Sequence, residues 1–188
     1  MAVGYNVRKA AQVVAFLLHE QGNRADMIKT VKLAYMSDRR FLELYGRPIL
    51  NDNLYCLDHG PIDSLTLDYI KGNISSAKNR SLWAQYVKPI DPATYQFSTA
   101  DGDLYFGELS EAEEKVLKET VADFKDMNPF ELVDWIHNNC REWSNPRGTS
   151  TYLSYAEVFK ALGKEHPSKR AKYVEKVRRL AEATNASA

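Results

Sequence analysis

Residues 33–72 read LAYMSDRRFLELYGRPILNDNLYCLDHGPIDSLTLDYIKG, and this stretch decides the fold of the 188-residue chain. Apolar residues recur at helical spacing from Asp26, which is a favourable N-cap, through to Tyr45. Gly46 can end the helix in a left-handed conformation, and Pro48 prevents the helix from resuming. The stretch therefore predicts a long helix that ends at Gly46 and a turn over residues 47–53.

One acid is out of place on this predicted helix. On a helical wheel, Asp38 falls in the middle of an apolar arc that contains Tyr35 and Phe41. An unpaired buried carboxylate is costly, so Asp38 must accept hydrogen bonds or stay protonated. The opposite, solvent-facing side is predicted to hold Lys29, Lys32, Arg39, Arg40 and Glu43.

The rest of the chain predicts a mainly α-helical α+β domain with one small antiparallel β-sheet. We expect a strand at residues 54–57 and two more at 95–97 and 104–106, joined by the turn Asp101-Gly102-Asp103. Gly60-Pro61 predicts the start of a helix that ends at Gly72. Residues 82–87 fit either a helical turn or a strand. Further helices are expected at 7–21, 110–126, from 129, at 154–162 and at 168–183.

Length and composition indicate one globular domain. We assign residues 1–165 to it, with a basic helix at 166–188 that packs on or extends the same domain. Two cysteines with no CxxC pair favour reduced, buried thiols and a cytoplasmic location. The first residues lack the apolar core of a signal peptide, and no apolar run approaches the length of about 20 residues that spans a membrane.

Charge is balanced overall but unevenly distributed. The net charge is zero, which argues against a dedicated nucleic-acid binder. Residues 101–134 are strongly acidic, whereas residues 164–179 are basic. The two segments are most simply solvated helix faces, but they could also face each other or offer surfaces to a charged partner. Nucleic-acid binding through residues 164–179 is a further hypothesis.

Candidate catalytic chemistry is limited to one corner. The four histidines form no metal-binding motif and no phosphate loop is present, so we expect no metal and no cofactor. Asp38, Asp58 and His59 could converge as the acid–base group of a hydrolase-like enzyme. The favoured interpretation is that His59 and Gly60 shape a tight turn whose backbone donates hydrogen bonds to Asp38. We therefore predict no catalytic residues.

Aromatic residues favour a binding protein. The chain has eleven tyrosines, and tyrosine and arginine are enriched at protein interfaces. His137 and Trp143 flank a predicted helix end, where a core tryptophan with a histidine bonded to backbone carbonyls is the simplest interpretation.

The order and spacing of several residues resemble the Panacea domain of SocA-like antitoxins. The resemblance covers about residues 7–162, and it is strongest in the string Asp38-Arg39, Tyr45-Gly46-Arg47-Pro48-Ile49 and Gly60-Pro61, with Leu132, His137 and Trp143 further on. It implies an antitoxin, of a kind found in bacteria and phages, that binds and neutralises a toxin encoded by an adjacent gene.

The resemblance also implies alternatives. The toxin could be an alarmone-synthetase-like enzyme that pyrophosphorylates nucleotides or tRNA, and the antitoxin could instead be an adaptor that delivers its toxin to a protease. A role in phage defence and a homo-oligomer or toxin–antitoxin hetero-oligomer are further expectations. Some family members carry an added DNA-binding domain, for which this chain has no spare length, so direct DNA binding is not expected.

Two sets of residues follow as hypotheses. We predict that toxin is contacted by exposed charged and aromatic residues: Arg39, Arg40, Glu43, Arg47, Asn51, Tyr55, Lys172 and Arg179. We predict that the fold is supported by Asp38, Gly46, Pro48, Gly60, Pro61, His137 and Trp143.

Overall fold

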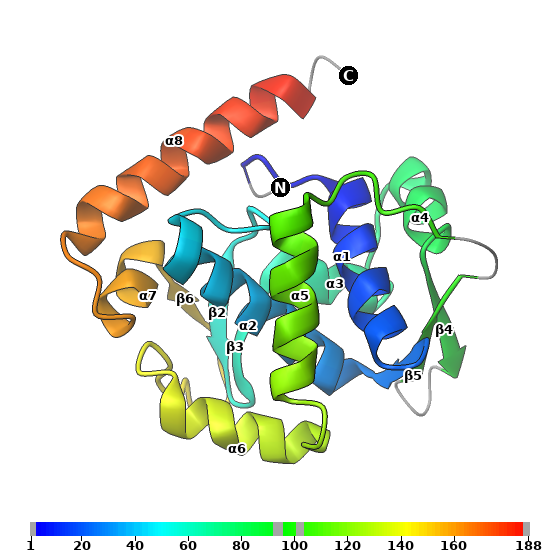
Figure 1. Cartoon of the computed structure of the whole chain (residues 1–188), viewed down its shortest axis with the longest axis horizontal. Helices are drawn as coiled ribbons and strands as arrows, with labels where there is room; N and C mark the ends of the chain where they lie inside the picture. The colour runs from blue at the N-terminus through cyan, green and yellow to red at the C-terminus, as the bar shows by residue number, and fades with distance from the viewer. Residues whose placement is uncertain (1–2, 92–95, 101–103, 186–188) are drawn as a thin grey trace.

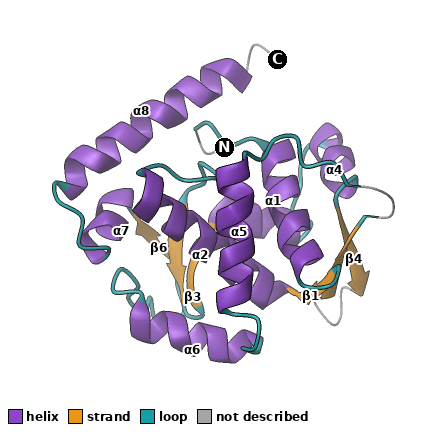
Figure 2. Cartoon of the chain, viewed as in Figure 1, coloured by secondary structure: helices purple, strands orange, loops and turns teal. Residues whose placement is uncertain are grey.

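The computed structural model describes residues 3–91, 96–100 and 104–185. These residues form eight helices and two three-stranded antiparallel sheets (Figures 1 and 2). The prediction of a mainly helical α+β fold is confirmed, but the single predicted sheet is wrong because its strands belong to two separate sheets. Within the described part of the chain, no helix combines the length and apolar character needed to cross a membrane.

Helix α2 (Met27–Tyr45) is the central element of the fold. The Asp26 side chain caps its start by accepting from the backbone N–H of Ile28 at 2.7 Å. Gly46 ends it at φ 70°, where a side chain would be strained. Both ends lie where the sequence predicts them. Around α2 pack α1 (Val7–Glu20), α5 (Glu111–Asp123), α6 (Pro129–Asn139) and strand β3 (Gly60–Asp63) (Figure 1).

One sheet has the order β1-β5-β4, from Arg24–Asp26, Gln96–Thr99 and Val87–Asp91. Strand β5 contains part of the strand predicted at 95–97, but it pairs with β1 and β4. Residues 104–106 form no strand, so the predicted hairpin is wrong; its turn at 101–103 and residue 95 lie outside the described residues. The ambiguous segment 82–87 is divided, because α4 (Ala77–Ala84) ends before β4 begins.

The other sheet has the order β3-β2-β6 and lies beside α2. Strand β2 (Leu54–Leu57) pairs with β3 on one side and with β6 (Thr151–Leu153) on the other. The predicted helix start at Gly60-Pro61 is therefore wrong, since these residues open β3, and helix α3 (Ser64–Ile70) begins three residues after Pro61. An outer strand tolerates Pro61, which lacks an N–H, and Gly60 turns the chain at φ 103°.

The C-terminal half adds short helices and one long one. Helix α5 begins with the predicted capping box of Ser110 and Glu113, and α7 (Tyr155–Ala161) has one of its own. Helix α8 (Pro167–Asn185) packs on α7 and reaches across to the N-terminal segment (Figure 1). Its buried Arg178 donates to the carbonyl of Val3 at 3.1 Å and to Asn53 Oδ1 at 2.9 Å.

Candidate functional site

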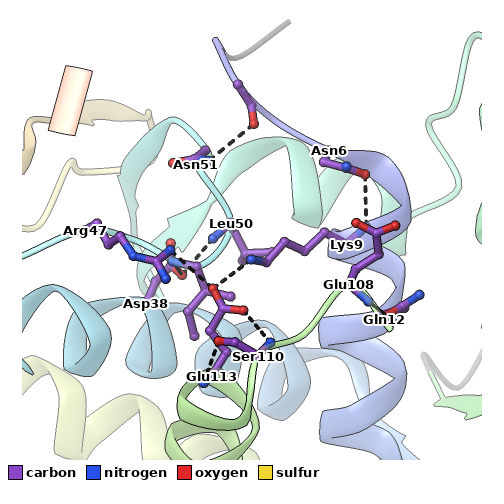
Figure 3. Close-up of polar contacts among 12 residues, drawn as sticks. Asn6, Lys9, Gln12, Asp38, Arg47, Leu50, Asn51, Glu108, Ser110 and Glu113 are labelled. Carbon is purple, nitrogen blue, oxygen red and sulfur yellow. Dashed lines mark hydrogen bonds and ion pairs between the residues drawn. The ribbon is translucent and has the colours of Figure 1, made fainter. Parts of the chain in front are cut away.

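The turn that follows α2, residues 46–50, is held by Asp38. One carboxylate oxygen, Oδ1, accepts from the backbone N–H of Ile49 at 2.8 Å and of Leu50 at 3.1 Å (Figure 3). Asp38 is buried, as are both of its donors. The predicted backbone partners near His59 and Gly60 are therefore wrong. Asp38 lies on α2, and its carboxylate binds the turn that directly follows the same helix. This contact explains the spacing between Asp38 and the Gly46–Pro48 segment.

A second acid, Asp63, lies against Asp38. Asp38 Oδ2 and both oxygens of Asp63 are buried and, as ionised groups, have no hydrogen-bond donor among the described residues. Burial raises the pKa of Asp38 to about 7, and it raises the pKa of Asp63 well above its usual range, with Asp38 adding to the effect. A proton shared between the two carboxyl groups links Asp38 Oδ2 to one oxygen of Asp63, which is the state expected for two acids in contact.

Two more polar groups complete this buried cluster. Asp52 accepts from the backbone N–H of Thr66 at 2.8 Å and from its hydroxyl at 2.9 Å. It thereby caps the first turn of α3, whose own N-cap residue, Asp63, makes no capping hydrogen bond. Lys32, predicted on the solvent-facing side, is instead buried, and its ammonium donates to the carbonyl of Pro61 at 3.0 Å. Burial lowers the pKa of Lys32 to about 7. The sequence carries no signal for this because β3, which covers Lys32, was predicted as helix.

The structure does not bring Asp58 and His59 to Asp38. Both residues are exposed at the tip of the β2–β3 hairpin, where Asp58 accepts from the backbone N–H of Gly148 at 2.9 Å. Asp63, which touches Asp38, lies at the end of β3 that is away from the hairpin tip. At about 3.3 Å per residue, the strand separates the two ends by roughly 10 Å. Within the described residues, no three His, Cys, Asp or Glu side chains are arranged to hold a metal ion.

Arg39 occupies a different environment from the one predicted. Its guanidinium donates to Glu142 through Nε at 2.6 Å and Nη2 at 3.3 Å, and Tyr35 donates to the same carboxylate at 2.8 Å. The Glu142 side chain is fully buried, and that of Arg39 is only 14% exposed. Arg39 is therefore part of the interior. Its partner Glu142 lies 103 positions further along the chain, so no local sequence pattern reveals the pairing.

Arg40 and Glu43 do lie at the surface. Arg40 binds Glu119 at 2.9 Å and also Asp123, both from the acidic helix α5. Glu43 is 4.0 Å from Lys164, at the start of the basic tail. A third acid of α5, Glu113, accepts from both Lys9 of α1 and Arg47 in the turn after α2 (Figure 3).

A groove of about 590 Å³ opens beside these residues, between α2, α5 and α6; we call it the α2 groove. Its lining combines apolar and aromatic side chains with a charged rim. These residues are Met36, Arg39, Arg40, Glu43, Leu44, Thr120, Asp123, Phe124, Met127 and Trp135. Leu44 is 57% exposed at its edge.

The remaining predicted contact residues are spread over the molecule. Asn51 donates to the carbonyl of Gly4, and Tyr55 packs edge-on against Tyr152, with ring centroids 5.6 Å apart. Lys172 and Arg179 line a separate groove beneath α8. The eight predicted contact residues therefore do not form one continuous surface.

His137 and Trp143 form one stacked pair. Their rings lie 3.7 Å apart at 10°, and Trp143 donates its indole N–H to the carbonyl of Leu57 at 2.9 Å. This bond links the end of α6 to the hairpin, and Pro61 and Gly60 lie in that same hairpin. Burial, with the nearby Lys32 ammonium, lowers the pKa of His137.

The fold and this geometry define a mainly helical α+β domain in which a buried aspartate ties α2 to the turn that follows it. A model of the family described as "Antitoxin SocA-like, Panacea domain" matches residues 31–144, which is more than half of the chain. The chain belongs to this family. Neither a search of curated proteins nor a search of solved structures found a match.

Proposed function

We propose that this protein is an antitoxin that neutralises a cognate toxin, encoded by an adjacent gene, through direct protein–protein binding in the cytoplasm. The observation that carries the proposal is membership of the SocA-like Panacea antitoxin family, whose match covers α2 from residue 31 onward and the turn that Asp38 closes. The role is non-catalytic. In support, the acids that a hydrolase would use are separated in the fold, and Asp38 is engaged in holding the backbone.

The α2 groove is the surface that best suits such binding. Its lining combines Trp135, Phe124 and Met127 with the charged Arg40 and Glu43. Tryptophan, methionine and arginine are enriched at protein interfaces, where an apolar centre with a charged rim is the usual arrangement. The proposed contact surface therefore centres on Arg40, Glu43 and Leu44, and Arg39, which also lines the groove, is held in place by Glu142.

We also propose that residues 166–188 belong to the same domain as residues 1–165. Arg178 supports this, since it joins α8 to Val3 and Asn53 and lies over the ring of Tyr155 at 5.4 Å. The family match ends at residue 144, so α7 and α8 lie beyond the matched region; α7 packs on α2, and α8 packs on α7.

Co-expression with the product of the adjacent gene tests the function. Growth should be arrested by that product alone and restored when this protein is present. The Leu44→Glu variant should lose rescue, because it places a charge at the edge of the α2 groove. Ile90→Glu, which alters another exposed aliphatic side chain in β4, is the matched control and should rescue like the wild type.

If the Leu44→Glu variant still rescues growth, the α2 groove is not the contact surface, but the antitoxin role stands. The level of the toxin during rescue separates direct neutralisation from delivery to a protease. In direct neutralisation, toxin accumulates in the complex, whereas protease delivery would deplete it.

A further inference from the structure

A second groove, of about 580 Å³, lies beneath α8. One wall comes from β6 and the start of α7, with Tyr152, Ser154 and Tyr155; the other comes from α8. The α8 wall consists of Ala171, Lys172, Glu175, Lys176 and Arg179. We call this the α8 groove. It is distinct from the α2 groove, since the two share no lining residue.

The α8 groove carries unpaired positive charge. Lys172, Lys176 and Arg179 are exposed, and none of them forms an ion pair with another described residue. The one acid in the groove, Glu175, is bound to Arg178 at 3.1 Å. Three acids of α5, Glu113, Glu119 and Asp123, are paired with Lys9, Arg40 and Arg47 rather than with the basic residues of α8. An excess of three cations is thus left for an outside partner.

The composition of the groove favours a polypeptide over a nucleic acid. The Glu175 carboxylate can accept from the backbone N–H groups of a peptide, whereas a sugar–phosphate backbone carries no such donor. Tyr152 is 52% exposed and offers a flat apolar surface with a hydroxyl. Strand β6, which contains Tyr152, is the outermost strand of its sheet, and outermost strands present unpaired backbone groups that an added peptide can use.

We propose that the α8 groove binds an acidic polypeptide segment of the toxin, as a second contact beside the α2 groove. The inference rests on the proposed antitoxin function. Carboxylates of the toxin segment pair with Lys172, Lys176 and Arg179, and its backbone lies between β6 and α8. Because exposed charges are screened by salt, this contact weakens as ionic strength rises.

The test compares two variants of the full chain that change the net charge equally. The groove variant is Lys172→Glu, Lys176→Glu and Arg179→Glu; the control is Lys78→Glu, Lys118→Glu and Lys169→Glu, three exposed lysines outside the groove. Circular dichroism and thermal unfolding verify that both are folded. Affinity for the purified product of the adjacent gene is measured by calorimetric titration at low and high salt.

We expect the groove variant to bind at least tenfold more weakly at low salt and the control to bind within about twofold of the wild type. Equal affinities of the two variants would overturn the inference and leave the antitoxin function standing. A wild type that binds no toxin would defeat the proposed function itself. A labelled single-stranded DNA that binds the wild type but not the groove variant, while toxin affinity is unchanged, would assign the groove to nucleic acid and also overturn the inference.

Discussion

At the scale of single residues, the structure depends on buried charges that are matched at close range. Asp38 shows this most clearly, because its carboxylate satisfies two backbone N–H groups that no helix or strand could satisfy. Asp38→Ala leaves both groups buried without an acceptor, at a cost of about 2 kcal/mol or more. Urea unfolding should show that loss, whereas Asp134→Ala, on the exposed face of α6, should stay near the wild type.

The pair of Asp38 and Asp63 predicts a dependence of stability on pH. The folded-state pKa of Asp38, about 7, lies above its ordinary value of 3.8, so the folded protein holds a proton that the unfolded chain releases. The stability that this proton provides is complete below pH 3.8 and is lost as pH rises through 7. Lys32 acts in a higher window, from about 7 upward, where its lowered pKa makes stability rise with pH.

Asp63→Asn isolates the effect of the acid pair. The amide replaces the shared proton with a permanent donor to Asp38. Relative to the wild type, the variant should gain in free energy of unfolding between pH 5 and pH 7. Urea titrations at those two pH values measure this gain. A difference between variant and wild type that is the same at both pH values would show that the two carboxyl groups do not share a proton.

Arg39 and Arg40 are neighbours in sequence, but replacing each by alanine should lower the free energy of unfolding by different amounts. Arg39→Ala leaves the buried Glu142 without its cation and should destabilise the protein by about 3 kcal/mol. Arg40→Ala removes solvent-exposed ion pairs, which are each worth about 1 kcal/mol or less. Thermal unfolding of the two variants compares these costs directly. Similar melting temperatures would contradict the interior assignment of Arg39.

At the scale of elements, helix α8 is attached through a close approach of two backbones. Gly4 has φ 77°, and a Cβ on it would lie within 2.3 Å of the carbonyl oxygen of Arg178. Gly4→Ala should therefore separate the N-terminal segment from α8 and expose α8 to limited proteolysis. Gly72→Ala is the matched control, because Gly72 has a similar φ of 79° but no atom within 4 Å of an added Cβ. Equal proteolysis of the two variants would contradict the attachment.

Helices with clear local start and stop signals could be predicted from the sequence, whereas strand pairing could not. The bounds of α2 and the capping box at Ser110 follow from local signals, and the structure has both. Gly60-Pro61 was misread because the same dipeptide can open a helix or an outer strand, and only pairing with β2 decides between them. The two sheets could not be separated from sequence for the same reason, since β6 joins β2 from about one hundred residues further along the chain.

At the scale of the whole molecule, the surface carries two separate grooves: the α2 groove is lined by charges of both signs, and the α8 groove is mainly basic. Arg39 was predicted as an exposed contact residue and Lys32 as part of the solvent-facing side of the long helix, but both are held in the interior by partners that are distant in sequence. The α2 groove depends on Trp135 and Phe124 from other helices, and a single-helix pattern cannot reveal it. The family resemblance was the reliable long-range signal, because it fixed the order of residues across several elements.

The central claim is that the protein neutralises its toxin by direct binding. The most direct measurement is co-purification of an affinity-tagged product of the adjacent gene with the untagged, full-length protein after co-expression, followed by light scattering of the eluted species. The account predicts that both chains elute together as one complex of defined mass and that the cells grow. Continued growth arrest, with the tagged protein eluting alone, would contradict it.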